Sequence, residues 1–373
     1  MTGRESEERL VQPVWERLSD QVLVHAKAPA GDRRLIPGLD FENGVVLCGA
    51  RAADATRALH AADVEAVLLD HERYEQLDAT AEHPFRPPHY DPTELALFAP
   101  DDPLQECMDS QHRLGVTAAL TPTGHLRADA VGALQAVVRG AHGLNQATDI
   151  LVVPLDAEWL ADDARIARVI AELDGVPHLK ALVLSAVRDP LRKVGSATRL
   201  RRLVSSVDRV ALLRTDLAGL DALAHGAVFA TIGINASTRH GRPPGAPPPR
   251  QPKGKRTRSA TVLHPRLMQY FHSETLDERY GYHSSPVCDC VGCDGRRLGS
   301  FSGSPEDIAR ANRHNLAIWS MWANELQALP NGSQRRHAWR RRCRDALQAH
   351  EELNAFLGPH VFEPTPALKE WAD

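Results

Sequence analysis

Three of the chain's six cysteines lie within the short segment CDCVGC, in the pattern C-x-C-x-x-C. One tight turn can point thiolates at this spacing toward a single atom, and Gly292 permits the backbone angles that such a turn needs. Zinc in a structural site takes four ligands, so a further side chain must complete the set. The pattern therefore predicts a structural zinc site with Cys288, Cys290 and Cys293 as three of its ligands.

The fourth zinc ligand is expected on a helix that follows the cysteines. His314 lies 21 residues after Cys293, in a segment that begins near Pro305 with the serine and early acids typical of a helix N-terminus. A site closed between a turn and a helix would hold together a region whose own core is small. His272 and His283 remain alternative ligands. The other cysteines are interpreted as ordinary thiols: Cys48, Cys107 and Cys343.

The elements that position these residues follow from hydrophobic periodicity. Apolar runs predict strands at 45–49, 66–70, 116–120, 149–155, 179–185, 209–213 and 227–233. Amphipathic segments such as 127–143 and 161–175 predict helices between them. Strands of this kind, separated by helices, indicate a parallel sheet buried on both faces. Seven or eight such units favour an α/β fold, a TIM (β/α)8 barrel, over an open Rossmann sheet, since no G-x-G-x-x-G follows the first strands.

Composition suggests three parts. Residues 1–39 lead into the barrel or lie partly outside it, and residues 40–287 form the barrel. Residues 288–373 form a zinc-binding and basic helical subdomain. The barrel part includes an insert at 240–260 that is rich in proline, lysine and arginine. We interpret it as a basic loop that can contact phosphates.

The chain shows no apolar leader segment and no run of 18 apolar residues. We therefore expect a cytoplasmic protein with no membrane partner. Clustered thiols in such a compartment are more often metal ligands than disulfides. The net charge of −4 predicts no nucleic-acid partner by itself, but basic residues concentrate at 335–344. On a helix, Arg336, Arg340 and Arg344 share one face beside Trp339, and this face could bind the phosphates or stack on a base of a nucleic acid.

Two segments carry a family resemblance. CDCVGC followed by RHNLAIW resembles the zinc region of the tRNA-guanine transglycosylases, the queuine and archaeosine tRNA-ribosyltransferase superfamily. GAVFATIGINASTRHGR is similar to the family segment G-x-D-x-F-D-x-x-x-P-T-R-x-x-R-x-G, with Thr238 and Arg239 at its Thr-Arg. The resemblance covers residues 40 to 330. It implies a barrel whose zinc region helps to bind RNA and forms a dimer interface.

The resemblance also implies an activity, the exchange of guanine in nucleic acid for a 7-deazaguanine. Enzymes of the family use one aspartate as a nucleophile, which forms a covalent link to the sugar, and a second aspartate to handle the proton. The second aspartate corresponds to Asp70, and Asp156 falls near the glutamine that reads the base. The nucleophile falls on Gly233, which has no side chain that can attack. The chain thus resembles a divergent member of the transglycosylase superfamily that lacks the usual nucleophilic aspartate.

Polar residues at strand ends could still build a pocket, because barrel enzymes carry their chemistry at the C-terminal ends of the strands. The candidate catalytic carboxylates are Asp70 and Asp156. The candidate substrate-binding residues are Thr121, Thr123, Ser185, Arg188, Asn235 and Arg239. For each carboxylate, a helix N-cap or a loop salt bridge is the structural alternative.

Two functional hypotheses follow. In the first, the protein is a pentosyltransferase that exchanges a 7-deazapurine-type base through an unconventional carboxylate, Asp70 or Asp156. In the second, it is a non-catalytic barrel that binds a nucleic acid, a nucleobase or another protein. Related proteins occur in nucleic-acid modification and antiviral cassettes, so the expected partner is tRNA or DNA. We expect a homodimer or a heterodimer.

Overall fold

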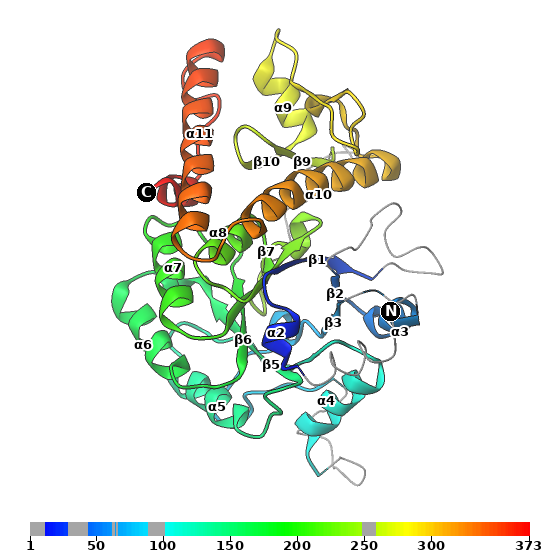
Figure 1. The fold of residues 1–373 in the computed structure, drawn as a ribbon, viewed down its shortest axis with the longest axis vertical. Coiled ribbons are helices and arrows are strands. Elements are labelled where there is room, and N and C mark those ends of the chain that lie inside the picture. The colour runs from blue at the N-terminus through cyan, green and yellow to red at the C-terminus, as the bar shows by residue number, and fades with distance from the viewer. Residues whose placement is uncertain (1–11, 29–43, 62–63, 65, 89–100, 248–258) are drawn as a thin grey trace.

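The computed structural model describes residues 12–28, 44–61, 64, 66–88, 101–247 and 259–373. Within these residues, eight parallel strands form a nearly closed barrel surrounded by helices (Figure 1). The predicted TIM-type α/β barrel is therefore confirmed. The barrel strands are β1 Gln21–Lys27, β2 Val45–Cys48, β3 Val67–Asp70, β4 Ala119–Leu120, β5 Asp149–Asp156, β6 Leu179–Ser185, β7 Val210–Thr215 and β8 Phe229–Gly233.

Helices cover the barrel and form most of the C-terminal part. Around the barrel lie α2 Val14–Arg17, α3 Ala52–Ala61, α4 Pro103–Arg113, α5 Val131–Ala141, α6 Asp163–Leu173, α7 Ser196–Ser206 and α8 Ala218–Ala224. The C-terminal part contains α9 Ser273–Tyr280, α10 Pro305–Gln327, α11 Ser333–Leu357 and α12 Pro366–Ala372. It also contains the antiparallel pairs β9 Thr261–His264 with β10 Gln269–His272, and β11 Val287–Cys288 with β12 Arg296–Arg297. Short 3₁₀ turns are η1 Arg73–Glu75, η2 Ala157–Leu160, η3 Ala236–Thr238 and η4 Leu298–Ser300.

Strand β1 is the barrel strand that the sequence analysis did not identify. Its sequence, QVLVHAK, is apolar only until His25, although burial continues through that histidine to Ala26. β1 pairs in parallel with β2 on one side and with β8 on the other, which places His25 beside Gly233. Each of the seven predicted strands overlaps an observed one, although β4 is only two residues long.

The two ends of the sheet, β3 and β4, meet and bring the barrel close to closure. The strand order is β3-β2-β1-β8-β7-β6-β5-β4, so β3 and β4 lie at the two ends of the sheet. Between them, the backbone N–H of Thr117 donates to the carbonyl of Val67 at 2.8 Å, and the N–H of Val67 donates to Thr117 Oγ1 at 2.9 Å. These two hydrogen bonds join the ends of the sheet, so the strands enclose a common interior.

The N-terminal end of the barrel is covered by α2, which lies over the centre of the strand ring in Figure 1. Val14 and Leu18 join the apolar cluster inside the barrel, and the N–H of Val14 donates to the carbonyl of Ala147 at 2.9 Å. Tyr74 belongs to the same cluster and lies just after the C-terminal end of β3. Because α2 covers the N-terminal end of the barrel, polar side chains can line its C-terminal end, as they do in barrel enzymes.

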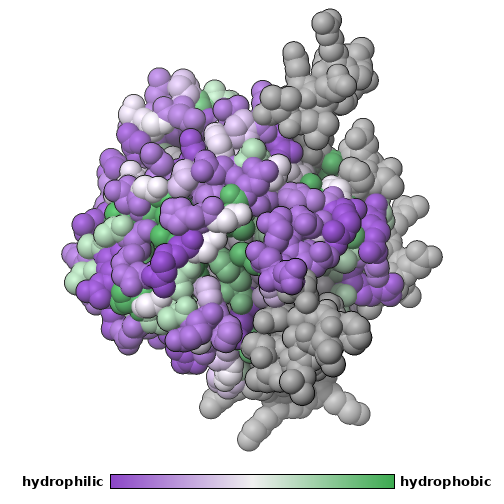
Figure 2. All heavy atoms as spheres, turned by 90° about the horizontal axis from the view of Figure 1, so that it is seen from below, coloured by the Kyte–Doolittle hydropathy of each residue, from purple (hydrophilic) through white to green (hydrophobic). Residues whose placement is uncertain are grey.

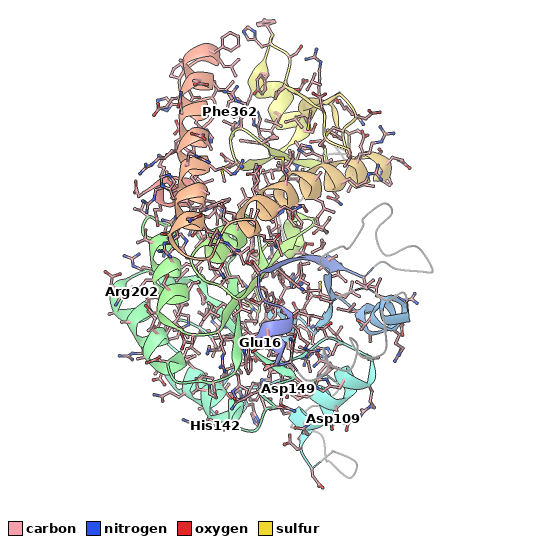
Figure 3. All side chains as sticks on the ribbon, in the orientation of Figure 1. Glu16, Asp109, His142, Asp149, Arg202 and Phe362 are labelled. Carbon is pink, nitrogen blue, oxygen red and sulfur yellow. The ribbon has the colours of Figure 1, made fainter. Side chains whose placement is uncertain are left out.

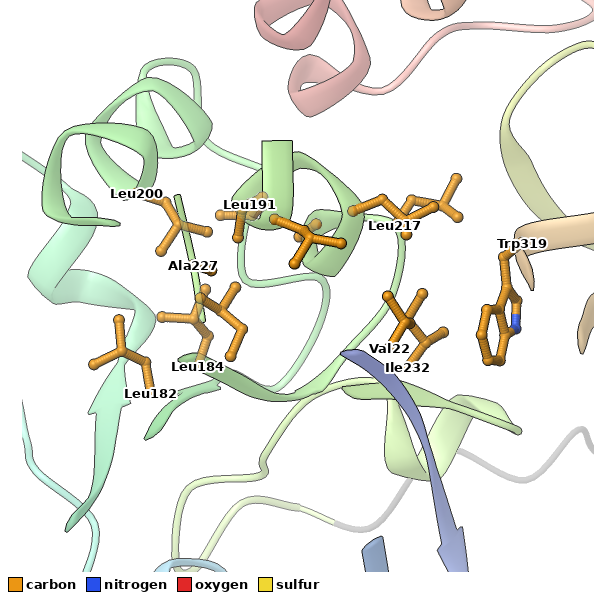
Figure 4. Close-up of a cluster of buried hydrophobic side chains, with 14 of the residues drawn as sticks. Val22, Leu182, Leu184, Leu191, Leu200, Leu217, Ala227, Ile232 and Trp319 are labelled. Atoms are coloured by element: carbon orange, nitrogen blue, oxygen red, sulfur yellow. The ribbon is translucent and has the colours of Figure 1, made fainter. Parts of the chain in front are cut away.

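A second hydrophobic cluster fills the space between the strands and the helices. Figure 4 shows Leu182 and Leu184 of β6 facing Leu200 of α7, and Val22 of β1 beside Ile232 of β8. Trp319 of α10 packs at the edge of the same cluster, and it is 1% exposed. The C-terminal helices therefore share a continuous core with the barrel, and this core fixes their position.

A half-buried ion pair between Arg335 and Asp20 reinforces this attachment. Arg335 of α11 donates to both carboxylate oxygens of Asp20, which directly precedes β1, and its Nε donates to the carbonyl of Leu329 at 2.9 Å. Gln327 of α10 donates to the carbonyl of Asp20 at 2.6 Å. Residues 248–258 of the predicted basic insert lie outside the described residues. At its start, the insert contacts the barrel through Gly241, whose N–H donates to the carbonyl of Leu184.

Candidate metal centre and strand-end site

The predicted metal ligands lie together. The Sγ atoms of Cys288 and Cys290 lie 3.4 Å from Nδ1 of His314, and that of Cys293 lies 3.2 Å from it. All four donor atoms lie within 4.8 Å of one another. In a tetrahedral site with metal–sulfur bonds of about 2.3 Å, neighbouring ligand atoms are roughly 3.6 Å apart. The predicted Cys3His group is therefore confirmed as a group that could hold a metal ion.

The surroundings of His314 orient it for this role. Its Nε2 donates to the carbonyl of Leu263 at 2.7 Å, so Nδ1 keeps its lone pair and points it at the three sulfurs. A Cβ on Gly292 would lie 2.5 Å from the backbone nitrogen of His314, so only glycine lets the cysteine turn pack this closely on α10. The alternative ligands lie elsewhere: His272 bonds the carbonyl of Ser259, and the ring of His283 packs on Phe356 at 4.5 Å.

Asp70 ends β3 inside a fully buried polar network. Tyr74 donates to its Oδ2 at 2.5 Å, the N–H of Glu72 donates to Oδ1 at 2.8 Å, and Nε2 of His25 lies 3.4 Å from Oδ2. Burial alone would raise the pKa of Asp70, but the His25 contact, the Arg214 charge and the Tyr74 hydroxyl lower that pKa to about 2. The carboxylate is thus ionised, and donors from its own protein already occupy it.

Arg214 of β7 extends this network across the barrel. Its guanidinium lies 2.7 Å from Glu72 and 2.9 Å from Glu75, and it donates to the carbonyl of Ser237 at 2.7 Å. Burial disfavours charge on Arg214, but Tyr74, Glu75 and Glu72 hold its pKa well above the usual value. Arg214 and Glu72 both adopt positive φ angles, 55° and 51°. Strained backbone of this kind persists where surrounding contacts fix it.

Gly233, where the resemblance places a nucleophilic aspartate, ends β8 against the loop that follows. A Cβ there would lie 2.2 Å from the carbonyl oxygen of Thr238 and 2.6 Å from the backbone nitrogen of Arg239. Both contacts are with backbone, which cannot rotate away as a side chain can. In this backbone conformation, an aspartate has no space at this position.

The candidates that follow β8, Asn235 and Arg239, belong to this loop. Asn235 caps η3, since its Oδ1 accepts the N–H of Ser237 at 3.1 Å. Arg239 stacks its guanidinium on the ring of Tyr270 at 3.4 Å and donates from Nε to the carbonyl of Gly233 at 3.3 Å. Burial lowers the pKa of Arg239. Both residues therefore have structural partners, and within the described part of the chain neither forms a hydrogen bond or ion pair with Asp70.

Thr121, Thr123 and Ser185 are buried between the ends of β4, β5 and β6. Thr121 accepts the N–H of Val152 at 2.8 Å and shares a 2.8 Å hydrogen bond with Thr123. Ser185 pairs with Asp156 across β5 and β6, and its hydroxyl has no hydrogen-bond partner among the residues that the structure describes. The segment at Gly241 covers this hydroxyl, since a Cβ on Gly241 would lie 2.5 Å from it. The two threonine hydroxyls thus link the ends of β4 and β5, and the serine hydroxyl is enclosed.

Asp156, a predicted catalytic residue, and Arg188, a predicted substrate-binding residue, line a common cavity. The cavity has a volume of about 260 Å³ and lies over the ends of β5 and β6. Asp156 Oδ1 accepts the N–H of Glu158 at 2.9 Å, so the side chain also caps η2. Oδ2 lies 3.8 Å from Nε2 of His125. The two candidate catalytic carboxylates therefore belong to different environments, one closed and one open.

The arginines of α11 divide into two groups. Arg336 and Arg340 line a surface hollow of about 610 Å³ together with His337 and Arg341, and no described acidic residue pairs with them. Arg344 is exposed too, but its Nε donates to the carbonyl of Ala372 at 2.8 Å. Trp339 is 1% exposed and packs on Trp371, so it cannot stack on a base, contrary to the expectation from the sequence.

Sequence reasoning missed several residues of these sites. His25 and Arg214 come from β1 and β7, and nothing local marks them as partners of Asp70. His125 and Asp78 were not among the predicted site residues. The run D-H-E-R-Y at 70–74 carried a signal, because its acids and tyrosine are close in sequence to the strand end.

No protein-family model matches the chain, and no curated protein matches it significantly. The resemblance to the transglycosylases accordingly rests on the motifs quoted above. None of the helices in the described part of the chain is long and apolar enough to cross a membrane. The face drawn in Figure 2 is mostly hydrophilic, with small hydrophobic areas between polar ones.

Proposed function

We propose that the protein is a transglycosylase-like barrel that binds nucleic acid and a guanine-type or 7-deazaguanine-type base, without exchanging the base through a carboxylate on β8. The observation that carries this proposal is the close packing at Gly233. The backbone of Thr238 and Arg239 fills the space that a nucleophilic side chain would need. Covalent catalysis at that strand end requires a side chain that can attack the sugar, and glycine offers none.

The state of Asp70 supports the same proposal. Its oxygens already accept hydrogen bonds from Tyr74 and from the backbone of Glu72. An attacking carboxylate must be free to approach the reacting carbon, within about 3–3.5 Å. Releasing Asp70 would break a network of buried charges, which is strongly destabilising when one partner remains unpaired.

The free arginines on α11 support nucleic-acid binding. Arg336, Arg340 and Arg341 lie within about one and a half turns of α11 and line a common hollow with His337. Arginine contacts to phosphates supply affinity that does not depend on sequence. We therefore assign the nucleic-acid contact to this hollow, with Arg341 added to the predicted set and Arg344 at its edge.

We also propose that the Cys3His group holds one structural Zn²⁺ per chain. Three thiolates and one imidazole are the donors that zinc prefers in closed sites. The bound ion would join the turn at Cys288–Cys293 to α10, whose own contacts hold it on the barrel core. The metal would then support the hollow on α11 indirectly, through the position of α10.

A base-exchange assay tests the proposed function. The purified protein is incubated with labelled guanine or 7-deazaguanine and with tRNA or DNA. We expect the nucleic acid to bind without incorporation of label and without a covalent adduct. Incorporation together with a denaturation-resistant adduct would contradict the proposal.

A second candidate function is base exchange through Asp156, because this carboxylate opens on a cavity while Asp70 does not. Incorporation of label that disappears in Asp156→Ala and persists in Asp70→Asn would favour it. Incorporation that disappears only in Asp70→Asn would contradict both candidates.

A further inference from the structure

The turn that joins α10 to α11 contains an asparagine followed by a glycine. Asn331 and Gly332 lie between the last residue of α10 and the first residue of α11 (Figure 1). Asn331 is exposed. Within the described part of the chain, its side chain forms no hydrogen bond, and the backbone N–H of Gly332 donates none. The two groups that can react with each other in such a pair are therefore both free.

An asparagine in this position can lose its side-chain amide without an enzyme. The backbone nitrogen of Gly332 attacks Cγ of Asn331, the bond from Cγ to the side-chain nitrogen breaks, and ammonia leaves with the proton of the attacking nitrogen. The product is a five-membered succinimide ring. Water then opens the ring at one of its two carbonyl carbons, which gives aspartate or isoaspartate. Both products carry one negative charge more than asparagine, so the modification changes local electrostatics.

The fold requires the glycine that makes this asparagine reactive. Gly332 has a φ of 96° and a ψ of −129°, a backbone conformation that residues with a side chain rarely adopt. A Cβ on Gly332 would meet no atom within 4 Å, so the requirement comes from the backbone angles and not from a lack of space. The same absence of a side chain leaves the nitrogen of Gly332 unhindered for attack. A bulkier residue would slow the reaction only by straining the turn.

Another exposed asparagine shows the opposite arrangement. Asn145 lies in the loop between α5 and β5, and its Oδ1 accepts the N–H of Ala147 at 2.9 Å. The residue after it is Gln146, whose side chain hinders attack by its backbone nitrogen. Asn145 is thus both held by a hydrogen bond and followed by a bulkier residue. It provides an unreactive reference in the same molecule.

The turn lies at the edge of the hollow on α11. Leu329 and Ser333, on either side of Asn331, both line this hollow, and so do Arg336 and Arg340. None of the described residues that line it is acidic, and the first turn of α11 contains no acid either. A carboxylate at residue 331 would add a negative charge to this edge, and it would repel the phosphates that the arginines attract.

We propose that Asn331 is a self-modifying site whose conversion to aspartate or isoaspartate weakens nucleic-acid binding as the protein ages. The backbone N–H of Arg336 donates to the carbonyl of Gly332 at 3.2 Å, so the new carboxylate lies about one helical turn before this arginine. The charge also interacts favourably with the positive end of the α11 dipole, which favours the modified form of the turn. The effect on binding rests on the proposed function of the hollow, whereas the conversion itself does not.

Peptide mapping by mass spectrometry tests the conversion. The folded full chain is incubated at mildly alkaline pH in oxygen-18 water and then digested in ordinary water, so that only conversion in the folded protein carries the label. We expect the peptide with Asn331 to lose its amide, to take up a labelled oxygen and to appear as two products. The peptide with Asn145 should stay unlabelled. An Asn331 peptide without label, or one labelled no faster than the Asn145 peptide, would overturn the proposal.

Filter binding to nucleic acid tests the consequence. Asn331→Asp represents the product, and Asn331→Gln is the matched control, because its longer side chain would have to close a larger ring, which forms far more slowly. Asn331→Asp should bind more weakly than fresh wild type, with a slope of log affinity against log salt that is smaller by about 0.7–0.9. Aged wild type should change in proportion to its converted fraction, and Asn331→Gln should bind like the fresh protein before and after the same incubation.

Converted wild type that binds like the fresh protein would overturn the proposal and leave the proposed function standing. If fresh wild type does not bind nucleic acid, the proposed function of the hollow fails, and the effect on binding fails with it. Label at Asn331 would then still establish the conversion.

Discussion

The hydroxyl of Tyr74 donates to Asp70 at 2.5 Å in the centre of the barrel's C-terminal end. Both residues are nearly inaccessible, with exposed fractions of 2% and 4%. A strand-end aspartate in a barrel suggests catalysis, yet here its oxygens are saturated by groups of the same chain. The contact therefore marks a closed polar core where an open active site was one of the expectations.

Replacing Tyr74 by phenylalanine should lower the free energy of unfolding by about 1.5–3 kcal/mol, since a buried charged acceptor loses its donor. Urea unfolding measures the change. Tyr282→Phe is the matched control, because Tyr282 is fully exposed and should tolerate the loss of its hydroxyl. Equal effects of the two substitutions would show that the Asp70 contact contributes nothing to stability.

Gly233→Ala should destabilise the protein by about 1–3 kcal/mol, because its methyl group would overlap the backbone of Thr238. Gly132→Ala is the control, since a Cβ on that residue of α5 meets only Ala81 at 3.8 Å. That change should leave stability unchanged or raise it by up to about 1 kcal/mol, because alanine favours helix. Thermal unfolding compares the two variants. A Gly233→Ala variant as stable as the wild type would contradict the expected overlap with the backbone of Thr238.

The Cys3His group should retain about one zinc ion per chain after purification, as measured by elemental analysis. Cys290→Ser should lose the metal and expose the backbone amides of the β11–β12 turn and of the start of α10 to hydrogen exchange. The barrel amides should keep their protection. Cys107→Ala is the control, since that thiol is not part of the cluster and the metal should stay bound. Full zinc content in Cys290→Ser would refute the ligand assignment.

Loss of Arg336 and Arg340 together should weaken binding to nucleic acid and flatten its salt dependence. Each lost phosphate contact lowers the slope of log affinity against log salt by about 0.7–0.9. Filter binding at several salt concentrations measures that slope. Arg202→Ala is the control, since Arg202 is exposed on α7 at the outer surface of the barrel (Figure 3). An unchanged slope in the double variant would place the nucleic acid elsewhere.

Stability should fall as the pH is lowered, and His264 should contribute to this fall. Burial and the nearby His350 and Arg266 lower the pKa of His264 from 6.5 to about 3. The unfolded chain then binds one more proton than the folded chain between these values. The contribution of His264 is therefore present above pH 6.5 and is lost toward pH 3, by about 1.4 kcal/mol per pH unit.

In the variant His264→Asn, the free energy of unfolding should decline less steeply with falling pH, because unfolding takes up about one proton fewer. Unfolding by urea at a series of pH values gives this slope. His142→Asn is the control, because His142 is exposed at the end of α5 (Figure 3) and its loss should leave the slope as it is. A slope in His264→Asn equal to that of the wild type would contradict the assignment.

Local patterns predicted the parts of the molecule that depend on local sequence. The cysteine spacing and the helix start at Pro305 were enough to identify the four residues that could hold a metal ion, because turn and helix geometry determine their positions. Seven strands followed from apolar runs. β1 was missed because His25 interrupts its pattern, and the reason for that histidine lies in Asp70, on another strand. The pairing of Arg214 with Glu72 and Glu75 likewise depends on barrel closure, which no local pattern encodes.

The pairing of β1 with β8 has a consequence for how the chain folds. Gln21 must find Phe229, about 200 residues later in the sequence. At a synthesis rate of about 20 residues per second, roughly 10 s pass between the appearance of these two strands on the ribosome. During this time, one edge of β1 has no partner, and an unpaired edge invites association with other chains. Barrel closure is therefore a late event, and a chain interrupted before β8 should be a target for chaperones rather than a stable fragment.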